Sequence, residues 1–547
     1  MHARVRARRT TIAIATTATF GLVLAACSGD ASTGDEASGE GDSLVIATAS
    51  QPASFSYETS ATGYAAAEFF ANTQATLIRN PYVEGSDGQD PMQDYYSFEP
   101  VLAESYDVSE DGLTYTFTLD PDAVSTAGNS LTADDVIFSL ERKFETASSI
   151  VSFVSAPVIT DPSTQVEKID DMTVSFTIAD RGYGFTLLSL LANTPFNIYD
   201  STVLSENATD DDPYAVEWSG SNPNSGFGAY EVVDFSPGEE IVYEANEGFV
   251  LGEPPIERIV QRVVADAGQR ANLVRAGDVQ IATQLRPADQ VELAREGVFV
   301  PEVDTNAITF MPLTTTLEPF DDVEVRRALA YAIPYDAIME DVYRGRAAPL
   351  AGILPSSAPG YDGSGLEPFT YDPETAESIL SDAGYDEPVS FTLTVNNGYP
   401  DLQETAVQIQ SAAQAAGFDI TIEPVNNATF QEGLAAKSFQ ASMGRDYAIV
   451  QSPPYVLSLF YTAGSPLNWP DWEDSAFYEA IDEGNAVGDP LTDEAGAYWN
   501  VAEQRIQSEV PTLWMAWVQP LNAFVEGIDG YAFRSDNVID YSELSFE

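Results

Sequence analysis

The chain has 547 residues, of which 44% are hydrophobic, and its formal net charge is −63 because 86 acidic residues stand against 23 basic ones. A chain of this length and hydrophobic content can bury large cores, so we expect two or three folded domains and not general disorder. A negative field of this size repels nucleic acid and anionic lipid surfaces, which excludes both as partners bound through charge. The acidity is typical of a protein solvated in a saline or exposed environment.

Residues 1–27 have the pattern of a lipoprotein signal. Arginines precede a short apolar stretch at 11–26, and the Leu-Ala-Ala-Cys sequence that ends at Cys27 has the form of a lipobox. About sixteen apolar residues are too few to span a membrane comfortably. We therefore expect cleavage before Cys27 and lipidation of that residue, with a plain secretory signal or an uncleaved anchor as the alternative.

Cleavage at this point removes His2, the only histidine, and lipidation consumes the only thiol. Mechanisms that need an imidazole or a free thiol are then excluded. We expect no cofactor and no metal site, although calcium on the acidic run 210–212 is an alternative to a solvated loop. Residues 28–42 are small, polar and acidic, which predicts a disordered tether between the anchor and the globular body.

The first half of the globular chain shows strand and helix patterns. The apolar run 44–48 is typical of a buried strand, and the alternation of apolar residues over 113–119 indicates a second one. Thr132 and Asp135 have the spacing of a capping box at the start of a helix. Further on, two runs that flank Pro237-Gly238 predict a hairpin.

The stretch 319–346 carries the clearest helix signals. Asp321 is expected to cap a helix, with Glu324 reaching back to it, and the apolar residues of 325–333 fall on one face. Pro334 interrupts this pattern before apolar spacing resumes. We expect two buried helical segments that meet at a corner.

The region that follows predicts an α/β unit. Asp372 is expected to cap a helix that begins with Pro373. A strand at 391–395, a helix at 402–416 and a second strand at 418–424 come next. This order favours mostly parallel pairing.

Several of these segments resemble the family 5 extracellular solute-binding proteins, the peptide-type receptors of ABC importers. The similar wording includes PFDDVEVRRALAYAI, DGLTYTFTL, LTADDVIFSLER and YDPETAESILSDAGY, and the resemblance extends over nearly all of residues 43–547. It implies an α/β, two-lobed periplasmic-binding-protein-like fold of type II, with the extra subdomain of the large peptide-binding class, mixed sheets and two hinge crossovers.

The resemblance also implies domain limits. Lobe I would comprise residues 43–305 plus 512–547, with an inserted subdomain at about 76–200, and lobe II residues 306–511. The extended run 307–311 and the segment 511–524 would be the two crossings between the lobes.

A binding site follows from the same resemblance. The sequence Met443-Gly444-Arg445-Asp446-Tyr447 is similar to the peptide-binding branch, in which an aspartate holds the α-ammonium of the ligand. Asp446 is therefore the expected anchor, with Arg445, Tyr447 and Met443 beside it; Met443 stands where tryptophan is usual. A surface aspartate paired with Arg445 is the structural alternative.

Other expected cleft residues come from loops and aromatic positions. For Ser50, Gln51, Gly226 and Phe227, the alternative is a plain turn that binds no ligand. For Trp469, the alternative is core packing within a turn that spans Asn468 to Asp474. The further candidates are Ser50, Gln51, Gly226, Phe227, Phe310 and Trp469.

The sequence thus predicts a monomeric substrate-binding lipoprotein on the extracellular face of the cell membrane. It would capture oligopeptides in a cleft between the lobes and deliver them to a membrane permease driven by its ATPase. A receptor for an oligosaccharide or another small solute is the alternative. A glycosidase that uses a pair of carboxylates is a remote third possibility, since neither a Gly-x-Ser-x-Gly nor a Ser-x-x-Lys motif occurs.

Overall fold

The computed structural model describes residues 43–60, 63–85, 88–146 and 149–547. The predicted signal, the lipidation site at Cys27 and the tether at 28–42 lie outside this part of the chain. Within the described ranges, every helix is too short or too polar to cross a membrane.

The first sheet has six strands and contains the predicted apolar strand in its interior. This strand, β1, pairs in parallel with β12 on one side and with β13 on the other. Gly238, with φ of +77°, turns the predicted hairpin between β10 and β11, where a left-handed backbone favours glycine. The strand order is β10 (Tyr230–Ser236), β11 (Glu240–Ala245), β12 (Arg258–Val263), β1 (Ser43–Thr48), β13 (Ile281–Ala282) and β20 (Ala523–Phe524).

A four-stranded antiparallel sheet and helix α3 (Ala133–Glu145) follow β1 in the chain. The backbone N–H of Thr132 donates to Asp135 Oδ2 at 2.7 Å, which confirms the predicted capping box. The sheet contains the predicted alternating strand, in which Tyr115, Phe117 and Leu119 are buried. Its order is β6 (Ala103–Val108), β7 (Thr114–Leu119), β9 (Thr173–Thr177) and β8 (Val166–Asp170).

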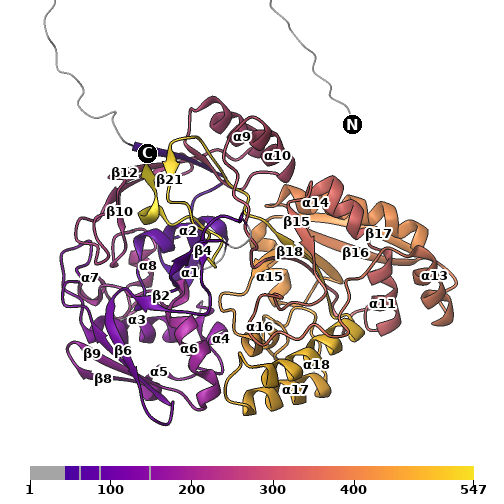
Figure 1. Ribbon diagram of the computed structural model, residues 1–547, viewed down its shortest axis with the longest axis horizontal. Helices are drawn as coiled ribbons and strands as arrows, with labels where there is room; N and C mark the ends of the chain where they lie inside the picture. Colours follow the sequence, from indigo (N-terminus) through magenta and orange to yellow (C-terminus); the bar gives the residue numbers. More distant parts are fainter. Residues whose placement is uncertain (1–42, 61–62, 86–87, 147–148) are drawn as a thin grey trace, which may run out of the picture. The chain divides into compact units, whose positions relative to one another are not determined.

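The second sheet also has six strands, and it is mixed. β16 pairs in parallel with β17 and β18, which confirms the predicted strand–helix–strand unit. The intervening helix α14 (Pro400–Ala413) packs on β16 and β17 (Figure 1). β14 is antiparallel to both β18 and β19. The order is β15 (Ala347–Pro349), β19 (Thr512–Val518), β14 (Ala307–Pro312), β18 (Ala441–Tyr447), β16 (Val389–Asn396) and β17 (Phe418–Val425).

Helix α11 (Val323–Ala332) begins one residue later than predicted. Its N-cap is Asp322, whose Oδ1 accepts the backbone N–H of Glu324 at 2.9 Å. Asp321 does not cap because it still belongs to the preceding turn, where its N–H donates to Leu317 O at 3.1 Å. The Glu324 carboxylate pairs with Arg327 at 2.6 Å and does not reach back.

The other predicted features of this region are present. The chain turns at Pro334 into α12 (Tyr335–Ala337) and a π-helical turn over 338–342, which together form the second segment. Asp372 caps α13 (Pro373–Asp382) by accepting the N–H of Thr375 at 3.0 Å.

The remaining helices have the following limits. Before β14 they are α1 (Tyr57–Ser60), α2 (Tyr64–Thr73), α4 (Val151–Val154), α5 (Pro162–Gln165), α6 (Gly184–Leu191), α7 (Ser201–Glu206), α8 (Val216–Ser219), α9 (Ala267–Ala276) and α10 (Pro287–Arg295). After β17 they are α15 (Asn427–Ala435), α16 (Pro453–Leu459), α17 (Ser475–Ala486) and α18 (Asp493–Glu509).

Separate cores accompany the two large sheets. One core consists of buried hydrophobic side chains from residues 308–518. Two other cores consist of side chains from 44–300 and 523–544, and one of these two also includes Val450 and Tyr455. The chain enters the second sheet at β14 and returns to the first sheet only after β19. The segment 512–518, which we assigned to lobe I with the rest of the C-terminal stretch, therefore lies in the second sheet because its backbone pairs with β14 and β15.

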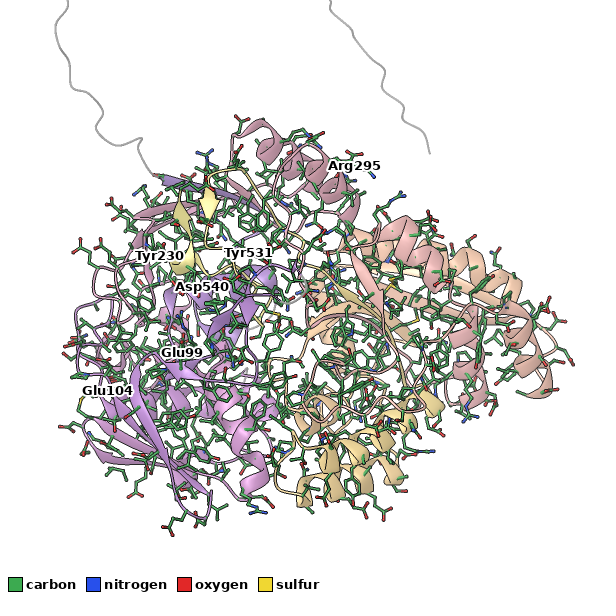
Figure 2. All side chains as sticks on the ribbon, in the orientation of Figure 1. Glu99, Glu104, Tyr230, Arg295, Tyr531 and Asp540 are labelled. Atoms are coloured by element: carbon green, nitrogen blue, oxygen red, sulfur yellow. The ribbon has the colours of Figure 1, made fainter. Side chains whose placement is uncertain are left out.

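The C-terminal segment is tied to the first sheet. The hydroxyl of Tyr230 donates to the backbone oxygen of Tyr541 at 3.2 Å, and Asp540 lies near Tyr230 (Figure 2). Asp540 also accepts the hydroxyl of Tyr82 at 2.8 Å. The last residues form β21 (Ile528–Asp529) and β22 (Ser545–Phe546), an antiparallel pair.

Candidate binding cavity

A cavity of about 380 Å³ is lined by segments that carry both large sheets. On the side of the first sheet these include parts of α1, α2 and α4, with Phe153 half exposed at the cavity wall. On the side of the second sheet they include the ends of β16 and β18 and the first turns of α14 and α15. Further lining comes from the segments 193–195, 284–285, 459–460, 466–467, 518–522 and 536–537.

The topology of the second sheet explains why polar side chains gather there. β16 and β18 are parallel neighbours, so their carboxyl ends meet at one edge of the sheet, where ligands bind in open α/β sheets. The end of β16 supplies Asn396, and the start of α14 that follows it supplies Tyr399 as the N-cap and Asp401 in the first turn. The end of β18 supplies Arg445, Asp446 and Tyr447.

Asp446 carries an unpaired carboxylate at this edge. Its Oδ1 accepts the backbone N–H of Tyr447 at 2.8 Å, and no cation pairs with it among the residues that the structure describes. Burial raises the pKa of Asp446 to about 6, and the Tyr447 N–H only partly offsets this effect. A group with an opposite charge would therefore be bound favourably beside this carboxylate.

Arg445 does not pair with Asp446, contrary to the structural alternative. Its Nη2 contacts Oδ2 of Asp401, and the two side chains are 9% and 3% exposed. The guanidinium lies 5.2 Å from the ring centroid of Tyr399, a cation–π contact. Nε of Arg445 is buried without a hydrogen-bond partner in the described part of the chain.

Neutral tyrosines surround the carboxylate. Burial raises the pKa of Tyr399, Tyr447 and Tyr455 above the ordinary value, and the charge of Asp446 raises all three further. Their hydroxyls remain protonated at neutral pH, so the negative charge stays on Asp446.

Trp469 belongs both to the cavity wall and to the core. It lines the cavity, and its ring stacks on Phe310 with centroids 4.6 Å apart. The side chain of Asn468 bonds both the N–H and the backbone oxygen of Trp472, which closes the turn that the sequence suggested. Phe310 lies behind Trp469, outside the cavity lining.

Four of the ten predicted ligand-binding residues, Arg445, Asp446, Tyr447 and Trp469, come together in the cavity lining. Met443 is fully buried in the core of the second sheet, because the strand places it deeper than Arg445. Phe227 is buried in a core of the first sheet, and a Cβ at Gly226 would meet Gln74 Oε1 at 1.9 Å. This glycine therefore permits close packing within the protein.

The predicted loop after β1 also lies outside the cavity lining. Gln51 Oε1 accepts the N–H of Gly238 at 2.7 Å, and its Nε2 donates to Ser236 O at 3.2 Å. Gln51 thus fastens the hairpin between β10 and β11, and Ser50, its neighbour, is exposed.

Sequence reasoning missed several cavity residues. Asn396, Tyr399 and Asp401 fall between a predicted strand and a predicted helix, and the end of a parallel strand was a usable signal for them. Asp536 and Asn522 reach the cavity from the C-terminal segment, and no local pattern pointed to them.

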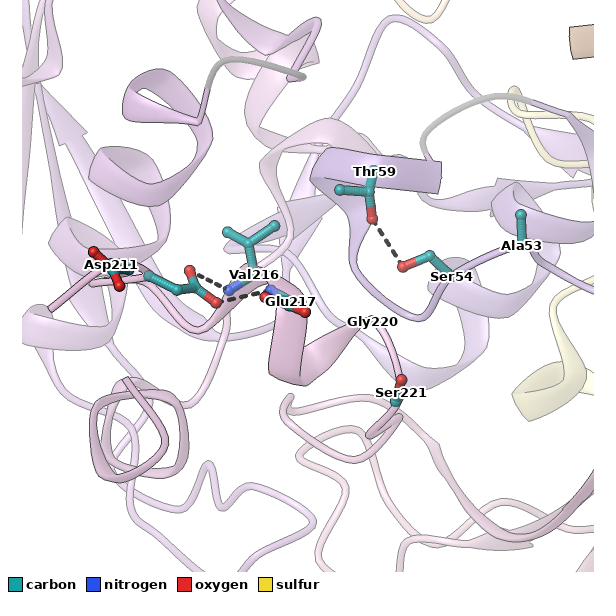
Figure 3. Close-up of a pocket in the computed structure, with 9 residues that line it drawn as sticks. Ala53, Ser54, Thr59, Asp211, Val216, Glu217, Gly220 and Ser221 are labelled. Atoms are coloured by element: carbon teal, nitrogen blue, oxygen red, sulfur yellow. Dashed lines mark hydrogen bonds between the residues drawn. The ribbon is translucent and has the colours of Figure 1, made fainter. Parts of the chain in front are cut away.

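A second, open pocket lies beside α8 and shows how the acidic run 210–212 is used (Figure 3). The carboxylate of Asp212 accepts the N–H groups of Val216 and Glu217, each at 2.9 Å. Ser54 and Thr59 share a hydrogen bond of 2.8 Å across the same pocket. In the described ranges, no group of three or more acidic, histidine or cysteine side chains is arranged to hold a metal ion.

Comparison with known proteins gives a consistent result. The model of the bacterial extracellular solute-binding proteins, family 5 (middle region), matches residues 97–467. Glutathione-binding protein GsiB of Pectobacterium atrosepticum is 26% identical over 467 residues, which cover 81% of this chain and 85% of that protein. Heme-binding protein A of Haemophilus influenzae is 28% identical over 384 residues, 66% of this chain and 67% of that protein.

A solved structure extends the comparison to the fold. The periplasmic binding protein DppA of Helicobacter pylori, associated with an ABC transporter and in complex with the peptide STSA, superposes with a TM-score of 0.80 at 21% identity. The match covers 92% of this chain and 98% of that chain. The predicted two-lobed periplasmic-binding-protein fold is thereby confirmed.

Proposed function

This chain belongs to the bacterial extracellular solute-binding proteins, family 5, and we propose that it is the receptor of an ABC importer and binds amine-bearing solutes, oligopeptides above all. The ligand occupies the cavity between the two sheets, and Asp446 holds its ammonium group. The names of relatives that bind glutathione and a short peptide support this ligand class.

The observation that carries the proposal is the unpaired carboxylate of Asp446 in a largely buried site. Burying a charge without a partner is costly, so the cavity contains a group that an ammonium would stabilise. Truncating one partner of a buried ion pair at an interface typically costs about 2–5 kcal/mol. The loss of this contact should therefore be visible in ligand affinity.

The N-terminal lipobox and the family suit a receptor that works at a membrane. We propose that Cys27 carries a lipid that anchors the protein to the outer face of the membrane, and that a separate permease and ATPase take up the ligand. The lipobox supports the anchor, and the family supports the transporter. A Cys27→Ser variant should appear in the medium and not in the membrane fraction; retention in the membrane would contradict the anchor.

Mass spectrometry of the solute that the purified protein releases on denaturation tests the ligand class. Short peptides or other primary amines are expected, and the Asp446→Asn variant should release much less of them. The Asp419→Asn variant is a matched control because Asp419 is exposed on β17 of the same sheet. An oligosaccharide or another amine-free solute would contradict the role of Asp446 and direct attention to Trp469.

A further inference from the structure

The charges that line the cavity restrict the ligand further than the amine alone. Only four charged residues line it within the described chain, namely Asp401, Arg445, Asp446 and Asp536. The short stretches that the description omits, 61–62, 86–87 and 147–148, contain no basic residue in the sequence. Arg445 is thus the single basic side chain in the described lining.

The guanidinium group in the described lining is already neutralised, and so is the carboxylate of Asp536. Arg445 pairs with Asp401, as described above. Arg534, which lies behind the lining, donates through Nε and Nη2 to the two oxygens of Asp536 at 3.0 and 2.9 Å. After these pairs are counted, Asp446 remains as an uncompensated negative charge, and no uncompensated positive charge remains in the described lining.

A zwitterionic dipeptide would bring a carboxylate as well as an ammonium into this cavity. The ammonium pairs with Asp446, but the carboxylate finds no free cation in the described lining and would be buried without a partner. A neutral amide at the same end avoids this cost. Arg445 lines the cavity, and its guanidinium N–H groups suit a neutral carbonyl oxygen because the positive charge is already paired with Asp401.

We propose that the cavity selects amines whose other end is neutral, such as peptide amides and aminoacyl amides, over dipeptides that bring a free carboxylate into it. The inference rests on the proposed function, because it assumes that the amine is held by Asp446. Arg445 donates a hydrogen bond to a carbonyl oxygen of the ligand. Asp401 sets the preference for a neutral end by neutralising the charge of Arg445.

Titration calorimetry at pH 7 with three probes tests this selection. The probes are Ala-Phe amide, Ala-Phe with its free carboxylate, and N-acetyl-Ala-Phe amide. We expect the amide to bind at least about tenfold more tightly than the free acid, since the acid buries an unpaired charge. The acetylated amide should not bind measurably.

The outcomes separate this inference from the proposed function. A free acid that binds as tightly as the amide overturns the selection but leaves the role of Asp446 intact. An acetylated amide that binds as tightly as the free amine overturns the role of Asp446 and the inference with it. Absence of binding by the amide also overturns the inference.

A variant sharpens the test by changing the charge alone. Asp401→Asn keeps the shape of the side chain but leaves Arg445 uncompensated, so the ratio of amide to acid affinity should fall several-fold. Asp419→Asn, exposed on β17, should leave the ratio unchanged. An unchanged ratio in Asp401→Asn, with binding retained, would contradict the role assigned to the Arg445–Asp401 pair.

Discussion

At the scale of single residues, Asp446 gives the cavity its chemical character. The sequence pointed to this residue through the segment 443–447, but it did not show what the carboxylate contacts. Its surroundings depend on residues far away in the chain: Asp401 binds Arg445 and so leaves Asp446 unpaired. Long-range pairing of this kind leaves no local pattern in a single sequence.

Ligand affinity should fall in mildly acidic solution. The free protein must have Asp446 ionised to bind an ammonium, and its pKa is raised to about 6 by burial. The tyrosines that face it, Tyr399, Tyr447 and Tyr455, stay neutral in this range because their pKa values are raised. Affinity for an amine measured by calorimetry should drop about tenfold between pH 7 and pH 5. A flat profile would contradict the assignment.

The free protein should become more stable when Asp446 is replaced by asparagine. The pKa of Asp446 is higher in the folded state than in the unfolded state, so the unsubstituted protein loses stability as the pH rises toward about 6. An asparagine side chain cannot ionise, so the variant does not lose this stability. Without ligand at pH 7, denaturant unfolding should show a gain of up to roughly 3 kcal/mol, and almost none at pH 3. Asp419→Asn serves as the control, and a loss of stability at pH 7 would contradict this reasoning.

At the scale of elements, the helices and strands that the sequence predicted are those with strong local signals. The capping box at Thr132 and the helix after Asp372 are present as expected. The N-cap of α11 was predicted one residue too early, because Asp321 and Asp322 can each cap a helix. Only the preceding turn determines that Asp322 does so. The antiparallel entry of β14 and β19 into the second sheet depends on distant pairing and was not predictable.

Glu503 on α18 offers a test of packing between elements. It is buried, its Oε1 accepts the N–H of Leu354 at 2.9 Å, and Oε2 has no partner in the described part of the chain. Burial raises its pKa to about 8. Because the folded-state pKa exceeds the unfolded value of about 4.5, the protein loses stability as pH rises between these values.

Glu503→Gln should remove this loss while keeping the bond to Leu354. The variant's free energy of unfolding minus that of the unchanged protein should increase by roughly 3 kcal/mol as the pH rises from 5 to 8. Urea unfolding at several pH values measures it. Glu479→Gln, exposed on α17, is the matched control, and parallel profiles for Glu503→Gln and the unchanged protein would contradict a buried neutral carboxyl.

At the scale of the whole molecule, the two large sheets are joined where the chain enters β14 and leaves β19. Arg346 spans this junction: its Nε donates to Gln290 Oε1 at 3.0 Å and its Nη2 to Pro301 O at 2.6 Å. The sequence suggested two crossings through family resemblance. It could not show that the cavity is lined from both sides, because that depends on the packing of segments hundreds of residues apart.

Ligand binding should bring the two sides of the cavity together. A ligand that contacts both stabilises the arrangement in which both contacts form, so the equilibrium shifts toward that arrangement. The radius of gyration from small-angle X-ray scattering should decrease when a peptide amide is added. Asp446→Asn at the same ligand concentration should show no decrease, and an unchanged radius in the unsubstituted protein at saturation would contradict closure.

The most direct test of the account is the affinity of one amine ligand for the unsubstituted protein and for Asp446→Asn. Titration calorimetry with Ala-Phe amide at pH 7 should show a loss of about 2–5 kcal/mol in binding free energy for Asp446→Asn and no change for Asp419→Asn. Equal affinities in Asp446→Asn and the unsubstituted protein would contradict the claim that this carboxylate holds the ligand.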